Sequence, residues 1–220
     1  MRVMSDACAS EFIAVLPPQA QTGRIHLRLF AAKVLALVVV AGALVSNHIY
    51  AAEGFADFLI ESVGLMLLVV GALGRVWSAA FISGKKSKVL VCVGPYSMTR
   101  NPLYFFSFLS WVGAGLSFGA LTLAAAFAAV FLLTHLHTIT QEEQFLQKKF
   151  GTAWDDYVRT VPRFFPRIHS VRGTPNATFE ALPFTRVIGE SALIMLVFIG
   201  TQLVEYLHAQ EIIPVFVSLP

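Results

Sequence analysis

The stretch Phe55–Ile82 reads FADFLIESVGLMLLVVGALGRVWSAAFI and carries no charged residue between Glu61 and Arg75. A bilayer core of about 30 Å needs roughly 20 predominantly apolar residues in a helix, so this stretch is long enough to cross it. Its apolar residues do not alternate with polar ones, which favours a helix over a barrel strand. Further apolar stretches expected to be membrane helices are Leu29–Tyr50, Leu103–Ser117, Ala120–Thr138 and Val187–Leu207. The sequence therefore predicts an all-α, polytopic membrane protein with about five transmembrane helices.

The composition supports this prediction. Of the 220 residues, 56% are hydrophobic and 13% are charged, whereas about 25% of residues are charged in an average soluble domain. The chain length is typical of one compact domain. We therefore expect a single membrane domain at residues 29–208, preceded by a cytosolic segment at residues 1–28 and followed by a C-terminal tail at residues 209–220.

Lysine and arginine residues follow a one-sided pattern along the chain. Apart from Lys33 and Arg75, all of them fall in three segments, which are residues 1–28, 83–102 and 139–186. Because cytoplasmic loops carry an excess of basic residues, these segments and the N-terminus are predicted to face the cytosol. The basic residues lie beside apolar stretches, so membrane lipids rather than nucleic acid are the expected partner despite the formal net charge of +3.

Two of the cytosolic segments are expected to have defined local structure. Residues 83–102 are predicted to form a loop in which an extended piece, Val89–Val93, precedes a Gly-Pro turn. Residues 139–166 are predicted to form two short helices, and Thr140 with Glu143 fits a capping box that opens the first. The remaining start and stop signals are Gly151, Thr152 and Pro162.

The same two segments carry the motifs that identify a family. The first block is Leu90-Val91-x-x-Gly94-x-Tyr96, followed by Arg100-Asn101-Pro102-x-Tyr104. The second block is Glu142-Glu143-x-x-Leu146, Phe150-Gly151, Trp154, Tyr157 and Val161-Pro162. In this order and spacing they resemble the isoprenylcysteine carboxyl methyltransferases and the related phospholipid methyltransferases, over about residues 71–166. The resemblance implies an integral membrane enzyme that methylates a lipid-like or prenylated acceptor at the cytosolic membrane face.

The resemblance also implies a site for S-adenosylmethionine, built from residues 83–104 and 139–166. The expected cofactor-binding residues are Lys88, Val89, Leu90, Val91, Tyr96, Asn101, Pro102, Leu103, Tyr104 and Glu143. A carboxylate suits the amino group or ribose hydroxyls of the cofactor, and a helix N-terminus suits its carboxylate. Methyl transfer depends mainly on holding donor and acceptor in near-attack geometry, so no metal is expected.

Two positions depart from the pattern of the family. Asn101 stands where most relatives have histidine, and an amide cannot take part in acid–base chemistry. Ile139 stands where the prenylcysteine enzymes place an arginine that would hold the substrate carboxylate. Arg100 could replace that arginine if it faces the pocket, and Glu142 is a candidate base for an amine acceptor if burial raises its pKa. The expected catalytic residues are therefore Arg100 and Glu142.

Two other functions remain open. Membrane reductases of steroid-like lipids, which use NADPH, resemble the same C-terminal pattern through Trp154-x-x-Tyr157. The acidic pair Glu142-Glu143 favours the methyl donor, whereas Trp154 favours the reductase. The third alternative is a non-catalytic membrane protein of the same fold.

Overall fold

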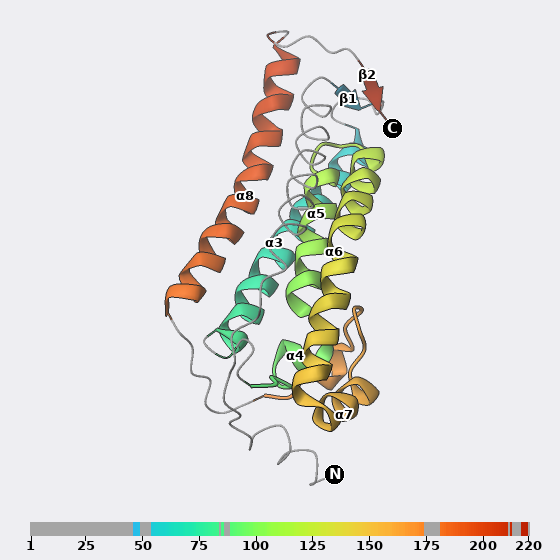
Figure 1. Ribbon diagram of the computed structural model, residues 1–220. Helices are drawn as coiled ribbons and strands as arrows, with labels where there is room; N and C mark the ends of the chain where they lie inside the picture. Colours follow the sequence, from blue (N-terminus) through green and yellow to red (C-terminus); the bar gives the residue numbers. More distant parts are fainter. Residues whose placement is uncertain are drawn as a thin grey trace, which may run out of the picture. The chain divides into compact units, whose positions relative to one another are not determined.

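The computed structural model describes residues 46–48, 54–83, 85, 89–173, 181–210, 212 and 217–219. Its α-helices are α3 (Phe55–Ile82), α4 (Pro95–Met98), α5 (Pro102–Leu116), α6 (Leu121–Phe150), α7 (Thr152–Thr160) and α8 (Ala181–Ala209). A 3₁₀ helix, η1, spans Ile168–Ser170, and strands β1 (Ser46–His48) and β2 (Val217–Leu219) pair in parallel (Figure 1). The prediction of an all-α fold is confirmed for these residues, apart from the two short strands.

Two of the described helices, α3 and α6, are long and apolar enough to cross a membrane. Helix α5 is also apolar but has only 15 residues. The last apolar stretch of the sequence lies within α8. Helices of membrane-spanning length are therefore present as predicted, while the total of about five spans stays a prediction.

The first predicted membrane helix, Leu29–Tyr50, lies outside the described residues except for Ser46–His48. These three residues form β1, so the prediction of a helix is wrong at this end. They pair in register with Val217–Leu219 of β2. The pairing gives the backbone groups of both strands hydrogen-bond partners.

The described residues divide into two compact units, and each is considered by itself. The first unit contains the described residues within 73–105 and 137–189. The second contains those within 21–72, 106–136 and 190–220. Helices α3, α5, α6 and α8 contribute residues to both units.

Glycine residues bring α3 and α5 into backbone contact in the second unit. A Cβ atom at Gly64 would lie 2.7 Å from the backbone nitrogen of Ser117, and one at Gly113 would lie 2.7 Å from the carbonyl oxygen of Gly64. No side chain fits at these distances, and small residues at such contacts are typical of packed membrane helices. Gly119, with a φ of 67°, makes the turn between α5 and α6.

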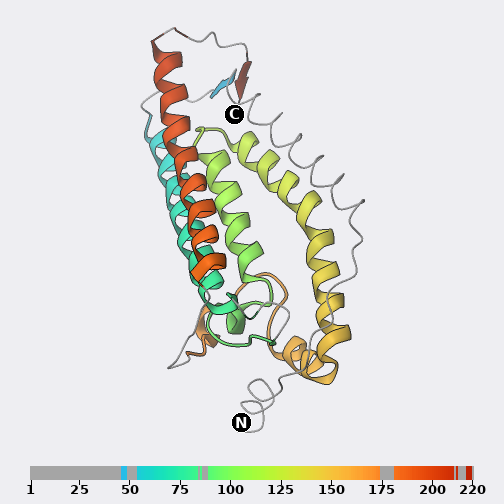
Figure 2. The same cartoon turned by 60° about the vertical axis from the view of Figure 1, so that its left-hand side comes forward.

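Helix α6 continues without interruption to Phe150 (Figure 2). The prediction that a separate helix begins at Thr140 is therefore wrong, and Thr140 and Glu143 do not form a capping box. Residues 136–150 contain neither glycine nor proline and are rich in strong helix formers, so nothing ends the helix at the membrane boundary. The predicted stop at Gly151 is confirmed, since this residue has a φ of 51° and α7 begins directly after it.

Helix α7 packs in the first unit against the stretch that precedes α4. Leu90 forms a buried apolar cluster with Trp154, Tyr157 and Val161. The Tyr157 hydroxyl donates to the backbone carbonyl oxygen of Tyr96 at 2.7 Å. Helices α4 and α7 consequently lie at the same end of α6 (Figure 1).

Candidate functional site

Glu143 is the centre of a polar cluster in the first unit. The Asn101 side-chain amide donates to Glu143 Oε1 at 2.9 Å, and Arg163 Nε donates to Glu143 Oε2 at 2.9 Å. Arg100 Nη1 lies 3.5 Å from Oε1. The Glu143 and Arg100 side chains are each only 14% exposed. Residues from two separated stretches of sequence, around Asn101 and around Glu143, therefore meet at one carboxylate.

Arg163 is the member of this cluster that the sequence analysis missed. Its Nη2 donates to Thr140 Oγ1 at 2.7 Å, one residue from the position where Ile139 replaces the arginine of the prenylcysteine enzymes. A guanidinium is thus present beside the acidic pair, but it comes from the segment after Pro162. The only signal in the sequence was that Pro162 ends α7, which lets the chain turn back.

Hydrogen bonds to backbone carbonyl oxygens hold the segment after Pro162 beside the residues that precede α5. Arg100 N donates to the carbonyl oxygen of Pro162 at 2.9 Å, and the Asn101 amide donates to the carbonyl oxygen of Arg163 at 2.9 Å. Thr99 Oγ1 donates to the carbonyl oxygens of Arg163 and Phe164 at 3.2 Å and 3.0 Å. The guanidinium of Arg163 is therefore placed by the same residues that precede α5.

Tyr104 and Glu142 form a second polar contact beside the first. The Tyr104 hydroxyl is hydrogen-bonded to the Glu142 carboxylate. Glu142 therefore meets a neutral donor, whereas Glu143 meets two guanidinium groups. The two neighbouring carboxylates therefore have different hydrogen-bond partners.

Tyr96 has a buried hydroxyl in this region. Its side chain is 6% exposed, and its hydroxyl has no hydrogen-bond partner among the described residues. Burial raises the pKa of Tyr96 well above its ordinary value, and the nearby Tyr157, Glu142 and Tyr104 raise it further. The hydroxyl consequently stays protonated at neutral pH, and an unsatisfied buried donor of this kind is suited to a bound polar ligand.

Gly94 directs Tyr96 to this position. It has a φ of 60°, and a Cβ atom there would lie 2.5 Å from the Phe81 ring. Glycine has neither the steric restriction on positive φ nor the extra atom, so it meets both requirements. Helix α4 begins at the next residue.

The remaining expected cofactor residues border these groups. Pro102 is fully buried and begins α5, and Leu103 is half-buried in the same turn. Leu90 is buried against α7, and Val89 and Val91 are half-buried. Lys88 lies outside the described residues.

These side chains can bind a polar organic ligand. Two carboxylates, one amide, two arginines and two tyrosines come from one small region. Within the described part of the chain, no group of three or more His, Cys, Asp or Glu side chains could hold a metal ion.

The sequence profile of the phospholipid methyltransferase family matches residues 59–153. This range contains the first block and the part of the second block from Glu142 to Gly151, so it includes both Asn101 and Glu143. The chain belongs to the phospholipid methyltransferase family. The family predicted from the motifs is thereby confirmed, and Arg163 lies beyond the matched range.

Two similar proteins align with most of this member of the family. The nickel-cobalt-cadmium resistance protein NccN of Alcaligenes xylosoxydans xylosoxydans is 35% identical over 182 residues, which cover 83% of this chain and 85% of NccN. The cobalt-zinc-cadmium resistance protein CzcN of Cupriavidus metallidurans is 31% identical over 161 residues, which cover 73% of this chain and 74% of CzcN. No solved structure matches the chain.

Proposed function

We propose that this family member transfers a methyl group from S-adenosylmethionine to a lipid-like acceptor at the cytosolic face of the membrane. The family match, together with the apolar helices α3 and α6, indicates a member of a membrane methyltransferase family. The observation that carries the finer proposal is the meeting of both family blocks at the Asn101–Glu143 hydrogen bond of 2.9 Å. A water-soluble donor and an apolar acceptor can meet only where the membrane borders the aqueous phase.

The residues present fit the cofactor. When bound, S-adenosylmethionine supplies an electrophilic methyl group on a positively charged sulfonium. The buried Tyr96 hydroxyl would donate to a polar group of the ligand, since the described residues leave it without an acceptor. Glu143 and Asn101 would hold the amino group or the ribose hydroxyls, and the charge of Glu142 would favour a cationic ligand nearby.

Two side chains, Arg163 and Glu142, indicate which chemical classes of acceptor fit the site. Arg163 supplies a guanidinium beside the acidic pair, so a carboxylate acceptor is compatible with this site despite Ile139. An acceptor that must lose a proton, such as an amine, would instead transfer it to Glu142. Arg100 would then help to hold Glu143 and need not touch the acceptor.

The reductase alternative loses its main support. Trp154, which favoured it, is 3% exposed and belongs to the apolar cluster with Leu90, Tyr157 and Val161. Packing therefore gives a sufficient reason for a large apolar residue at this position.

Calorimetry with purified full-length protein tests the proposal. S-adenosylmethionine is expected to bind, and Glu143→Ala is expected to weaken binding by about 1.5–3 kcal/mol through the loss of a charged hydrogen-bond acceptor. Asp156→Ala is the matched control, because Asp156 is a 61% exposed carboxylate of the same unit. Labelled-methyl transfer to total membrane lipids, prenylcysteine analogues and small thiols would then identify the acceptor. Absence of donor binding to a folded protein would reject the proposal.

A part in tolerance of divalent transition metals is a second candidate, which rests on the similarity to NccN and CzcN. If it depends on methyl transfer, cells that express the Glu143→Ala protein will be as sensitive to nickel, cobalt and cadmium as cells without the gene. Equal tolerance with the wild-type and variant proteins would separate the two functions.

A further inference from the structure

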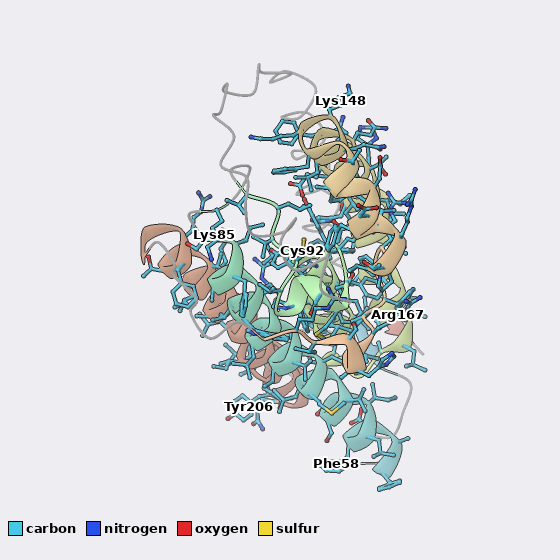
Figure 3. All side chains as sticks on the ribbon, turned by 90° about the horizontal axis from the view of Figure 1, so that it is seen from below. Phe58, Lys85, Cys92, Lys148, Arg167 and Tyr206 are labelled. Carbon is cyan, nitrogen blue, oxygen red and sulfur yellow. The ribbon has the colours of Figure 1, made fainter. Side chains whose placement is uncertain are left out.

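The segment Arg163–Arg172, which follows α7, presents apolar side chains on its outside. Phe165 and Ile168 are 73% and 75% exposed, and Val171 is 46% exposed. These three side chains fall within seven residues of sequence, and exposed apolar residues concentrated in this way are typical of a contact surface. Figure 3 shows the labelled Arg167 at the outer edge of this segment.

Ring contacts of Phe164 and Phe165 show which part of the segment packs against the protein and which part is exposed. Phe164 faces inward, and its ring meets that of Phe105 edge to face at a centroid distance of 5.8 Å. The Phe165 ring packs edge to face on that of Phe164, at a centroid distance of 5.6 Å and an interplanar angle of 87°, and the rest of its surface is exposed to solvent. The segment therefore has one face committed to the protein and one face left uncovered by the described residues.

The backbone of the segment is tied to α4 and to the turn before it. Arg167 N donates to the carbonyl oxygen of Met98 at 3.0 Å, and Gly94 N donates to the carbonyl oxygen of Arg172 at 2.7 Å. Arg172 N in turn donates to Ser97 Oγ at 2.8 Å. These hydrogen bonds fix which side chains point outward.

The uncovered face is also cationic. Arg167 and Arg172 are exposed, and His169 lies between them in the sequence. Residues 163–172 contain no acidic residue. Aromatic and aliphatic side chains that alternate with arginines are typical of segments lying in the plane of a membrane interface.

We propose that the segment Arg163–Arg172 lies on an anionic lipid surface, with Phe165 and Ile168 inserted among the acyl chains and the arginines at the headgroups. Charge complementarity selects lipid over other occupants, because the cytosolic leaflet is anionic and each nearby arginine increases partitioning about fivefold. The predicted orientation places this segment on the cytosolic side. Lipid contact would also steady the backbone around Tyr96, since residues 94–98 share hydrogen bonds with the segment. The inference does not depend on methyl transfer.

Hydrogen–deuterium exchange of the full-length protein in nanodiscs tests this inference. Nanodiscs of phosphatidylcholine alone are compared with nanodiscs that also contain phosphatidylglycerol. The anionic lipid is expected to slow amide exchange in peptides covering residues 163–172 and 94–99 by about fivefold or more. High salt should remove most of this difference, because exposed charges are screened.

Two variants separate the apolar and cationic contributions. The double variant Phe165→Ser with Ile168→Ser is expected to lose protection in both lipids, and Arg167→Gln with Arg172→Gln is expected to lose only the response to phosphatidylglycerol. Phe145→Ser is the matched control, since Phe145 is a 39% exposed aromatic residue of the same unit outside the segment, and it should behave as wild type.

Two outcomes would overturn the inference. Equal exchange in the two lipids at low salt would exclude an anionic surface. Protection that persists in detergent and disappears when residues 1–28 are deleted would show that another part of this chain covers the segment. Because no cofactor is present in the experiment, failure here is distinguishable from failure to bind S-adenosylmethionine.

Discussion

At the scale of single residues, the two adjacent glutamates of α6 have different tasks. Neighbouring side chains on a helix point in directions about 100° apart, so the two carboxylates reach different partners. Glu143 is compensated by Arg100 and Arg163, whereas Glu142 accepts a hydrogen bond from Tyr104. Glu143 therefore joins the two stretches of sequence that form the site, and Glu142 lies beside it in contact with Tyr104.

Replacement of Arg163 by Gln is expected to lower the free energy of unfolding by about 0.5–1.5 kcal/mol. Two hydrogen bonds to Glu143 and Thr140 are lost, but the side chain is 47% exposed, so water offsets part of the loss. Denaturant unfolding in detergent measures the change. Arg159→Gln is the control, since Arg159 is 78% exposed and meets Asp156 at 3.5 Å. An equal decrease in the free energy of unfolding for both substitutions would contradict the hydrogen bonds assigned to Arg163.

Replacement of Tyr96 by Phe is expected to have opposite effects on stability and binding. The hydroxyl is a buried donor without a partner, so its removal should leave stability unchanged or raise it by up to about 1–3 kcal/mol. Binding of S-adenosylmethionine should weaken if the hydroxyl serves the ligand. Thermal unfolding and calorimetry on the same sample measure the two effects.

Tyr157→Phe provides the contrast for this experiment. The Tyr157 hydroxyl donates to the carbonyl oxygen of Tyr96 at 2.7 Å, so its removal should destabilise the protein by about 0.5–1.5 kcal/mol. If Tyr96→Phe destabilised the protein as much, its hydroxyl would have a structural partner and the argument for a ligand would fail.

The residues of the site were predictable to different degrees. Asn101 and Glu143 were found because they belong to family blocks with fixed spacing. Arg163 was not, because its contact with Glu143 depends on the path of the chain after Pro162, and neither periodicity nor spacing encodes that path. The roles assigned to Lys88, Arg100 and the other expected site residues stay predictions.

At the scale of elements, the predicted helix end at Gly151 and the predicted helix start at Thr152 are confirmed, whereas the predicted start at Thr140 is wrong. Gly151 ends α6 because its positive φ suits glycine. Thr140 resembled a helix start, but it lies inside the continuous helix α6, where its hydroxyl accepts a hydrogen bond from Arg163. The paired strand at Ser46–His48 could not be predicted, because its partner lies at the other end of the sequence.

The close contact between α3 and α5 gives a prediction for glycine positions. Gly113→Ala is expected to destabilise the protein by about 1–3 kcal/mol, because the new Cβ would lie 2.7 Å from the carbonyl oxygen of Gly64 and force the helices apart. Gly200→Ala in α8 is the matched control, since a Cβ there meets nothing within 4 Å. Thermal unfolding in detergent distinguishes them, and similar values for the two variants would mean that the helices do not approach through Gly113.

At the scale of the whole molecule, the proposed function depends on which side of the membrane the polar residues face. S-adenosylmethionine is charged and made in the cytosol's aqueous phase, so a site on the opposite face could not receive it. The sequence places nearly all lysines and arginines in segments predicted to be cytosolic, including those that contain Asn101 and Glu143. The proposed function therefore requires the predicted orientation.

Labelling of introduced cysteines tests that orientation. A cysteine that replaces Glu53 should react with a membrane-impermeant maleimide in intact cells, and one that replaces Lys86 should react only after the membrane is opened. Both positions lie outside the described residues, so the prediction rests on the positive-inside rule. The unmodified chain controls for Cys8 and Cys92, which lie in the segments predicted to be cytosolic. If position 86 reacted in intact cells and position 53 did not, the cluster around Glu143 would face away from the cofactor supply, and methyl transfer from S-adenosylmethionine would have to be abandoned whatever its geometry.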